Sequence, residues 1–194
     1  MGYSSVLAQA LSAPPYIVSF GVVLLVAFRS DKQGSRSGYI ITFALIATAG
    51  YLTIVLSGIL SLPNFIRYLG LYPACMGFFT CVTLIITWNL NNQDSETKKG
   101  SATAMLQFLG QFGPLVGTRL FPASDGPLYG RGMAVCAAFM CGVAILAFAL
   151  RGVLQRENAR HRREATMVDN SGGDEQPLVG DMDRAARGTF MYIL

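Results

Sequence analysis

Charged side chains are scarce in this chain of 194 residues, because Asp, Glu, Lys and Arg together make up 13% while hydrophobic residues make up 52%. The mean hydropathy of +0.44 is too high for an ordinary water-soluble domain. The composition therefore indicates a protein whose solvent is largely lipid.

Histidine is almost absent, since His161 is the only one in the sequence. The cysteines match no zinc or redox spacing; they are Cys75, Cys81, Cys136 and Cys141. We therefore expect no metal site and no cofactor, and no enzyme, because no segment gathers a nucleophile, a base and a metal. A nucleic-acid partner is not expected either, because basic and aromatic residues do not interleave on a soluble face.

Long uncharged runs alternate with short charged segments. A bilayer core of about 30 Å needs roughly 20 apolar helical residues. The pattern predicts an all-α membrane protein with about five transmembrane helices, forming a bundle over 13–152: 13–29, 38–60, 66–88, 100–120 and 131–152. Pro14 and Pro15 suit a helix start, where their missing N–H groups need no partner. Pro73 and Pro114 lie inside predicted spans and tend to kink them.

Basic residues are unevenly divided between the two sides of this topology. Short cytoplasmic loops are rich in Lys and Arg, and ten such residues fall on the side of the tail against three on the other, Arg67, Arg119 and Arg131. We predict that 1–12 is an extracellular lead-in segment and 153–194 a cytoplasmic tail, in a multi-pass protein of the plasma membrane. The stretch from Asn170 to Gln176 is polar, contains glycine and has no hydrophobic period, which predicts disorder over 165–185.

Polar groups inside the spans are candidates for a substrate path, because burying an unpaired amide or hydroxyl in hydrocarbon is costly. Gln107 and Gln111 are one helical turn apart and share a face. Asn64, Tyr68 and Tyr72 offer further polar groups. We take these five as candidates for lining a substrate cavity, with hydrogen bonds between helices as the alternative role. No ionisable Asp, Glu, Lys, Arg or His occupies the middle of any predicted span.

Two ladders of small residues have the spacing that lets transmembrane helices approach closely. Gly113 and Gly117 form one, and Ala134, Ala138 and Gly142 form the other. Both are expected to serve ordinary helix packing, and a dimerisation face is the alternative.

The loop after the first predicted span reads Ala27-Phe28-Arg29-Ser30-Asp31-Lys32-Gln33-Gly34-Ser35-Arg36. Through Asp31, Lys32, Gly34 and Arg36 it resembles the signature loop of the major facilitator superfamily, Gly-x-x-x-Asp-Arg/Lys-x-Gly-Arg-Arg/Lys, in the copy between helices 8 and 9. Ala27 stands for the first Gly and Ser35 for one basic residue. Asp31 is expected to lie near the positive N-terminus of a neighbouring helix and to pair with Arg36, holding the cytoplasmic side in one of two states. A simple charged turn is the alternative.

Later segments resemble the fungal anion:cation symporter branch, which includes allantoate and nicotinate permeases. Trp88, Asn92, Thr97 and Lys98 match its Trp-x-x-Asn-Asn-x-x-Gly-x-Thr-Lys-Arg loop, with Ser95 in place of Gly. Asp125, Pro127, Tyr129 and Gly132 match its Asp-x-Pro-x-Tyr-x-x-Gly loop. The tail is similar through Glu157-Asn158, Asp181 to Asp183 and Phe190-Met191-Tyr192, whereas Gln111 stands where that branch has a Gly-Asn pair.

The resemblance covers residue 14 to the end. It implies that the five spans correspond to helices 8 to 12 of a twelve-helix fold, the C-terminal half of a permease. Such a permease moves a small organic anion, such as a vitamin or ureide carboxylate, by alternating access with proton coupling. The expected partners are the lipid bilayer, the anion, and an absent N-terminal half or another membrane chain. The alternative is a truncated, non-transporting membrane protein or a helix-packing scaffold.

Overall fold

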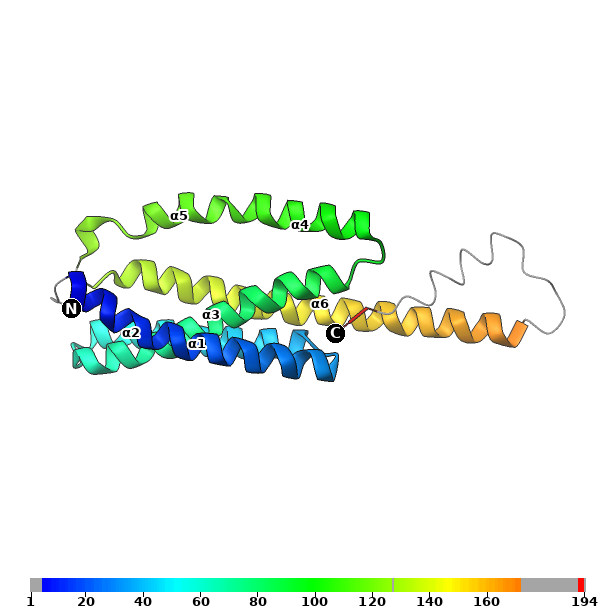
Figure 1. Cartoon of the computed structure of the whole chain (residues 1–194), viewed down its shortest axis with the longest axis horizontal. Coiled ribbons are helices and arrows are strands. Elements are labelled where there is room, and N and C mark those ends of the chain that lie inside the picture. Colours follow the sequence, from blue (N-terminus) through cyan, green and yellow to red (C-terminus); the bar gives the residue numbers. More distant parts are fainter. Residues whose placement is uncertain (1–4, 127, 172–191, 194) are drawn as a thin grey trace.

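The computed structural model describes residues 5–126, 128–171 and 192–193. Its elements are α1 (Ser5–Gln33), α2 (Ser37–Ile59), α3 (Asn64–Asn91), α4 (Glu96–Gly110), α5 (Phe112–Leu120), the 3-10 turn η1 (Ala123–Asp125) and α6 (Gly130–Ser171). The helices run roughly along one common axis and form an elongated bundle (Figure 1). The predicted all-α fold is confirmed, since the described residues contain no strand.

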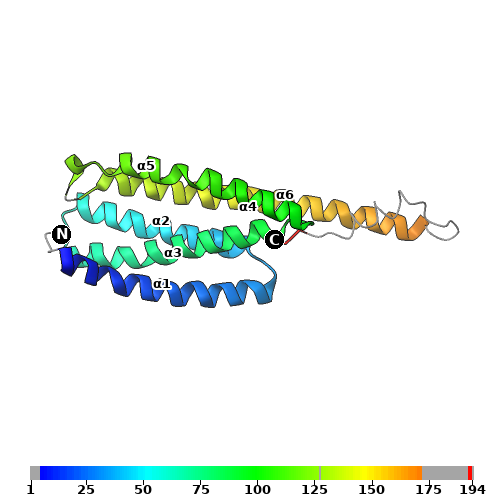
Figure 2. The ribbon, with the colours of Figure 1, turned by 45° about the horizontal axis from the view of Figure 1, so that its top comes forward.

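Four of these helices are long and apolar enough to cross a membrane: Gln9–Gln33, Ser37–Ile59, Asn64–Asn91 and Gly130–Arg163. Four of the five predicted spans overlap them. The connections from α1 to α2 and from α2 to α3 are short, so that consecutive helices turn back on one another (Figure 2). The chain is therefore a multi-pass membrane protein.

The remaining predicted span, 100–120, is divided into α4 and α5, which roughly continue one another (Figure 1). The division follows from Pro114, which has no N–H to donate to the carbonyl of Gly110. The N–H of Gln111 lies 3.2 Å from the carbonyl oxygen of Gln107 and 3.3 Å from that of Phe108, a local tightening of the helix. Among their described residues, α4 and α5 contain none that is buried.

The first span starts earlier than the sequence predicts. Because α1 begins at Ser5, the expectation that Pro14 and Pro15 start this helix is wrong, and part of the predicted lead-in segment is helical. Inside a helix, Pro15 cannot donate to the carbonyl of Leu11. The hydroxyl of Tyr68, on α3, donates to that carbonyl at 3.0 Å instead. The proline pair is tolerated because a neighbouring helix supplies the missing donor.

The last helix continues well beyond its predicted end at residue 152, since α6 reaches Ser171. Residues 165–171 are therefore helical, although the sequence predicts disorder from residue 165. The rest of that stretch, 172–185, lies outside the described residues.

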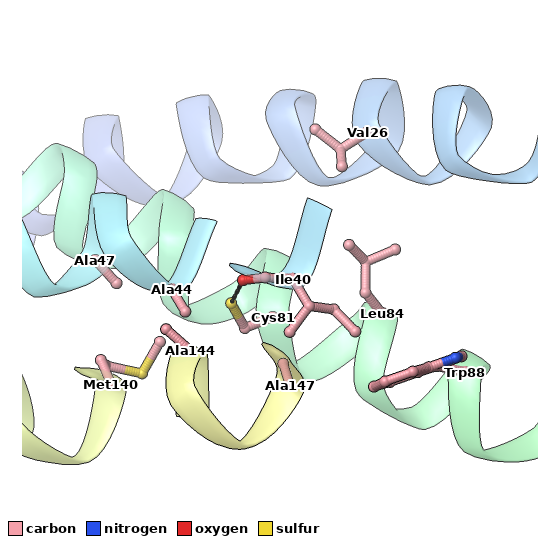
Figure 3. Packing of buried hydrophobic residues seen from close by; sticks show 10 residues of the cluster. All are labelled: Val26, Ile40, Ala44, Ala47, Cys81, Leu84, Trp88, Met140, Ala144 and Ala147. Atoms are coloured by element: carbon pink, nitrogen blue, oxygen red, sulfur yellow. Dashed lines mark hydrogen bonds between the residues drawn. The ribbon is translucent and has the colours of Figure 1, made fainter. Parts of the chain in front are cut away.

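The core lies where α2 packs against α3 and α6, with α1 on another side of α3. Its buried hydrophobic residues come from four helices (Figure 3): Val26, Ile40, Ala44, Ala47, Cys81, Leu84, Trp88, Met140, Ala144 and Ala147. The backbones of α2 and α3 approach each other closely. A Cβ added at Gly50 would lie 2.4 Å from the backbone nitrogen of Ala74, and one at Gly77 would lie 2.4 Å from the carbonyl oxygen of Phe43.

Gly50 and Gly77, where α2 and α3 approach each other closely, belong to neither of the two ladders seen in the sequence. An added Cβ would meet nothing within 4 Å at Gly113, Gly117 or Gly142. The expectation that these glycines serve packing within the bundle is therefore wrong. The alternative, a dimerisation face, stays a prediction.

Candidate functional site

Ten basic residues lie at one end of the bundle, which we call the basic end. There α1 ends and α2 begins, α3 ends and α4 begins, and α6 runs past them (Figure 1). These residues are Arg29, Lys32, Arg36, Lys98, Lys99, Arg151, Arg156, Arg160, Arg162 and Arg163. Arg67, Arg119 and Arg131 lie at the opposite end, because they occur at the start of α3, the end of α5 and the start of α6.

Arg36, the residue before α2, connects the ends of three helices. Its side chain is 8% exposed, and its Nη2 donates to Oδ1 of Asp31 on α1 at 2.5 Å. The amide oxygen of Asn91, at the end of α3, faces the same guanidinium because only that atom of the amide accepts. It accepts from Nη2 at 2.7 Å and from Nε at 3.2 Å. We call Asp31, Arg36 and Asn91 the Arg36 cluster; it contains the ion pair expected from the sequence and one further partner.

The turn between α1 and α2 brings the two members of this ion pair together. Gly34 has a φ of +60°, a conformation that glycine adopts without steric cost. Its N–H lies 3.3 Å from the carbonyl oxygen of Asp31, which closes the turn. Lys32 is exposed. Of the four signature residues, Asp31 and Arg36 form the contact, Gly34 shapes the turn and Lys32 stays at the surface.

The corner between α3 and α4 has its own local interactions. Ser95 caps α4, since its Oγ accepts from the backbone N–H of Lys98 at 3.3 Å. The Nζ of Lys98 lies 2.8 Å from Oδ1 of Asp94, and this hydrogen-bonded ammonium lowers the pKa of the Asp94 carboxyl. Thr97 is exposed. The structure thus pairs Lys98 with Asp94 at the surface of this corner.

Three side chains bind the backbone of Tyr192 and Ile193. Two of them, Trp88 and Asn92, lie at the end of α3, and the third is Asn158 of α6. Oδ1 of Asn92 accepts from the backbone N–H of Ile193 at 2.8 Å, and its Nδ2 donates to the carbonyl of Ile193 at 3.3 Å. Asn158 makes the same pair with Tyr192, both bonds being 2.9 Å long. Nε1 of Trp88 donates to the carbonyl of Ile193 at 2.7 Å. We call Trp88, Asn92 and Asn158 the two-asparagine site.

At the opposite end, the loop before α6 is attached to the start of α3. Arg67 is 9% exposed, and its Nη2 donates to the carbonyl of Leu128. Within the loop, the N–H of Tyr129 donates to the carbonyl of Asp125 at 2.9 Å, and Tyr129 has a φ of 46°. Pro127 lies outside the described residues. Asp125 and Tyr129 therefore close the loop, and Arg67 attaches it to the bundle.

Replacing Arg67 by Met keeps most of the aliphatic stem but removes the donor for the Leu128 carbonyl. We expect the loop to detach, because the Leu128 carbonyl loses the donor that connects it to α3. Limited proteolysis of the purified chain in detergent, with a protease that cleaves after aromatic residues, should cut at Phe121 or Tyr129 several-fold faster. Arg119→Met, which removes an exposed cation at the same end, is the matched control. Equal cleavage rates in the two variants would contradict this role of Arg67.

A cavity of about 270 Å³ lies beside this loop, between it and the end of α2. Its charged lining residues are Asp125 and Arg131, and the rest of its lining includes Ile54, Val55 and Leu128. The five residues that we predicted as cavity lining are not among those that line it.

Those five residues occupy two separate regions. The Tyr68 and Tyr72 hydroxyls on α3 lie 3.2 Å apart, and Tyr68 makes the interhelical hydrogen bond described above. Asn64 is exposed at the start of α3. Gln107 on α4 and Gln111 after it are exposed. The structure therefore joins the two tyrosines on α3 by a hydrogen bond, whereas the two glutamines lie exposed at the end of α4.

Several residues of these sites carry only a weak signal in the sequence. Asn158 could be found through the Glu157-Asn158 element of the tail, and Asn91 through the Asn-Asn pair of the same loop as Trp88. Ile193 offers no signal, because it takes part through its backbone alone.

Homologues of this chain are fungal transporters of the major facilitator type. The chain is 28% identical over 99% of its length to the high-affinity nicotinic acid transporter of Saccharomyces cerevisiae, covering 35% of that protein. It is 30% identical over 78% of its length to the MFS transporter prlL of Fungal sp. (strain NRRL 50135), covering 30% of it. With the major facilitator-type transporter hxnP of Emericella nidulans the identity is 28% over 95% of this chain and 37% of the relative.

The chain spans about a third of the length of the curated relatives it matches. No protein-family model matches it, and no solved structure matches it. The relatives are named as transporters and not as enzymes.

Proposed function

We propose that this chain is the C-terminal part of a major facilitator transporter of the anion:cation symporter branch, which moves a small organic anion by alternating access coupled to protons. One observation carries the proposal: nearly the whole chain aligns with about a third of a nicotinic acid transporter. The four long apolar helices support it, because a transporter of this kind is a bundle of membrane-crossing helices.

In this proposal the basic end faces the cytoplasm, and the N-terminus of the chain lies outside. The excess of Lys and Arg at that end supports the orientation, since short cytoplasmic loops retain such residues. The plasma membrane is the proposed location.

The Arg36 cluster has a mechanical role in this proposal. Alternating access rocks one group of helices against another around a central site. A group that rocks as a body needs its helices tied together, and Arg36 ties α1, α2 and α3 at the basic end. The cluster would keep these three helices moving as one unit.

The transported anion would be bound largely by other parts of the transporter. The middle of each predicted span in this chain lacks Asp, Glu, Lys, Arg and His. A cation that binds a carboxylate and a carboxylate that carries the coupled proton would therefore come from the remaining two thirds of the protein. The exposed Gln107 and Gln111 stay as candidates for polar contacts with the anion.

A chimera tests this proposal directly. The aligned 35% of the Saccharomyces cerevisiae nicotinic acid transporter is replaced by this chain, and uptake of labelled nicotinate is measured in cells that lack their own transporter. We expect uptake well above that of cells carrying an empty vector, with labelled allantoate as a second substrate.

The purified chain alone, reconstituted in liposomes, is the matched control and should show no uptake, because a third of a transporter encloses no site between two halves. A chimera that reaches the cell surface without transporting either anion would contradict the proposal. It would favour the alternative, a non-transporting membrane scaffold.

A further inference from the structure

The two residues held by the two-asparagine site are bound through their backbones. In an extended chain, the N–H and C=O of one residue point to the same side, and those of the next residue point to the other side. Tyr192 is paired with Asn158 of α6, and Ile193 is paired with Asn92 of α3. Each asparagine thus pairs with the N–H and the C=O of one residue, and consecutive residues pair with different asparagines, which is the pattern that an extended chain presents.

The match between site and ligand is chemically complete. A primary amide carries one acceptor and a donor side by side, which complements the N–H and C=O of a peptide residue. The two asparagines satisfy both N–H groups and both carbonyls of the dipeptide. Trp88 uses the second lone pair of the Ile193 carbonyl. Five hydrogen bonds to two residues make this a built site and not a chance contact of a terminal segment.

Side chains add a preference to this backbone recognition. The ring of Tyr192 lies 6.2 Å from the ring of His161, one turn after Asn158 on α6. An aromatic residue therefore suits the first position of the bound dipeptide. The second position is bound by Trp88 and Asn92 through its peptide groups only.

The location of the site gives it a mechanical consequence. α3 and α6 each pack extensively against α2, and they make little direct contact with each other. The dipeptide bridges the end of α3 and the middle of α6 (Figures 1 and 2). Removing it would take away five hydrogen bonds that connect these two helices at the basic end.

We propose that Trp88, Asn92 and Asn158 form a peptide-binding site at the basic end, which recognises the backbone of an extended dipeptide and is occupied by Tyr192–Ile193 of the same chain. The ligand class is an extended peptide with an aromatic residue at the first of the two bound positions. Occupancy holds α3 to α6, and release lets their ends separate. The site is independent of any transported substrate.

Trp88 is the single tryptophan of the chain, so its emission reports directly on this site. In a variant lacking residues 188–194, we expect the emission to shift to longer wavelength, because the indole N–H loses its carbonyl partner and meets water. A synthetic peptide with the sequence of residues 188–194 should reverse the shift in a saturable manner. The same peptide added to the full chain in detergent should have a much smaller effect, because the site is already occupied.

A peptide methylated on the backbone nitrogens of Tyr192 and Ile193 is the decisive control, since it keeps every side chain but loses both donors. We expect it to bind roughly tenfold more weakly or worse. Equal binding of the methylated and unmethylated peptides would overturn the proposal, because recognition would then rest on side chains. An unchanged Trp88 emission after truncation would overturn it as well.

A second measurement avoids the truncation. Asn92→Asp and Asn158→Asp are isosteric changes that replace a donor by an oxygen facing a carbonyl. In the full chain carrying both, amide hydrogen exchange at Tyr192 and Ile193 should become at least tenfold faster than in the wild type. Gln155→Glu adds one negative charge, half of that in the double variant, at an exposed position of α6 and should leave the exchange unchanged. Equal exchange in the wild type and the double variant would contradict the site.

Discussion

Replacing Gly77 by Ala should strongly lower the free energy of unfolding of this bundle. Among the glycines of α2, α3 and α6, only Gly50 and Gly132 have neighbours as close to an added Cβ. The new Cβ would lie 2.4 Å from the carbonyl oxygen of Phe43 and 2.6 Å from the Cβ of Ala47, both on α2. The Phe43 atom belongs to the backbone of a helix and cannot rotate away. The variant can therefore fold only if α2 and α3 move apart.

Such a separation is costly because lipid gives transmembrane helices no hydrophobic reason to associate. The contact between α2 and α3 depends on close packing, and this pair forms the centre of the core. Overpacking a core costs about 1–3 kcal/mol when side chains can adjust, and we expect about 3 kcal/mol or more here. Cys81, one turn after Gly77, is 2% exposed, so its reaction with a thiol-sensitive dye during heating reports the unfolding.

Gly142→Ala on α6 is the matched control. An added Cβ meets nothing within 4 Å there, and alanine favours a helix over glycine by up to about 1 kcal/mol. The control should unfold at the same temperature as the wild type or slightly above it. If Gly77→Ala behaved like this control, α2 and α3 would not be in the close contact described above.

The membrane-crossing helices could be predicted well because their signal is local. Uncharged runs placed α2 at 38–60 and α3 at 66–88, against Ser37–Ile59 and Asn64–Asn91 in the structure. The far end of α6 could not be placed this way, because hydropathy marks where the apolar stretch ends and not where the helix ends. Residues after 152 are rich in Arg, Glu and Ala, which favour a helix in a polar setting.

The contacts between helices were harder to predict, because spacing shows which residues share a face but not what that face meets. Gly113 and Gly117 have the ladder spacing and meet nothing, whereas Gly77 lies against α2. Pro15 looked like a helix start because the sequence does not show that Tyr68 supplies the missing donor. Both errors have the same cause: the deciding partner lies on another helix.

The candidate sites also differ in how well the sequence predicts them, according to whether their partners lie close together in the chain. Asp31 and Arg36 are five residues apart, so a single loop motif is enough to predict their ion pair. Asn92 and Ile193 are 101 residues apart, and the hydrogen bonds between them use backbone atoms of Ile193. A contact of that kind leaves no pattern in one sequence, because any residue other than proline presents the same N–H and C=O.

Replacing Arg36 by Met should uncouple the ends of α1 and α3 from α2. The change removes the ion pair with Asp31 and both hydrogen bonds to Asn91 while keeping an unbranched apolar side chain at a position that is 8% exposed. The Asp31 carboxylate is 59% exposed and can be solvated again, so only part of the pair energy is lost. The half-buried Asn91 amide loses its partner, and we expect a loss of about 2 kcal/mol in the free energy of unfolding.

Two other variants separate the role of the site from the role of charge. Lys32→Met removes an exposed cation from the same loop and should leave the unfolding temperature in detergent unchanged. Asp31→Asn keeps an oxygen that can accept from Arg36. Its unfolding temperature should lie between those of Lys32→Met and Arg36→Met. In the nicotinate chimera, Arg36→Met should lower uptake more than Asp31→Asn does. If Lys32→Met lowered the unfolding temperature as much as Arg36→Met, the loop would act through its net charge. The contacts of Arg36 with α1 and α3 would then not account for its effect on stability.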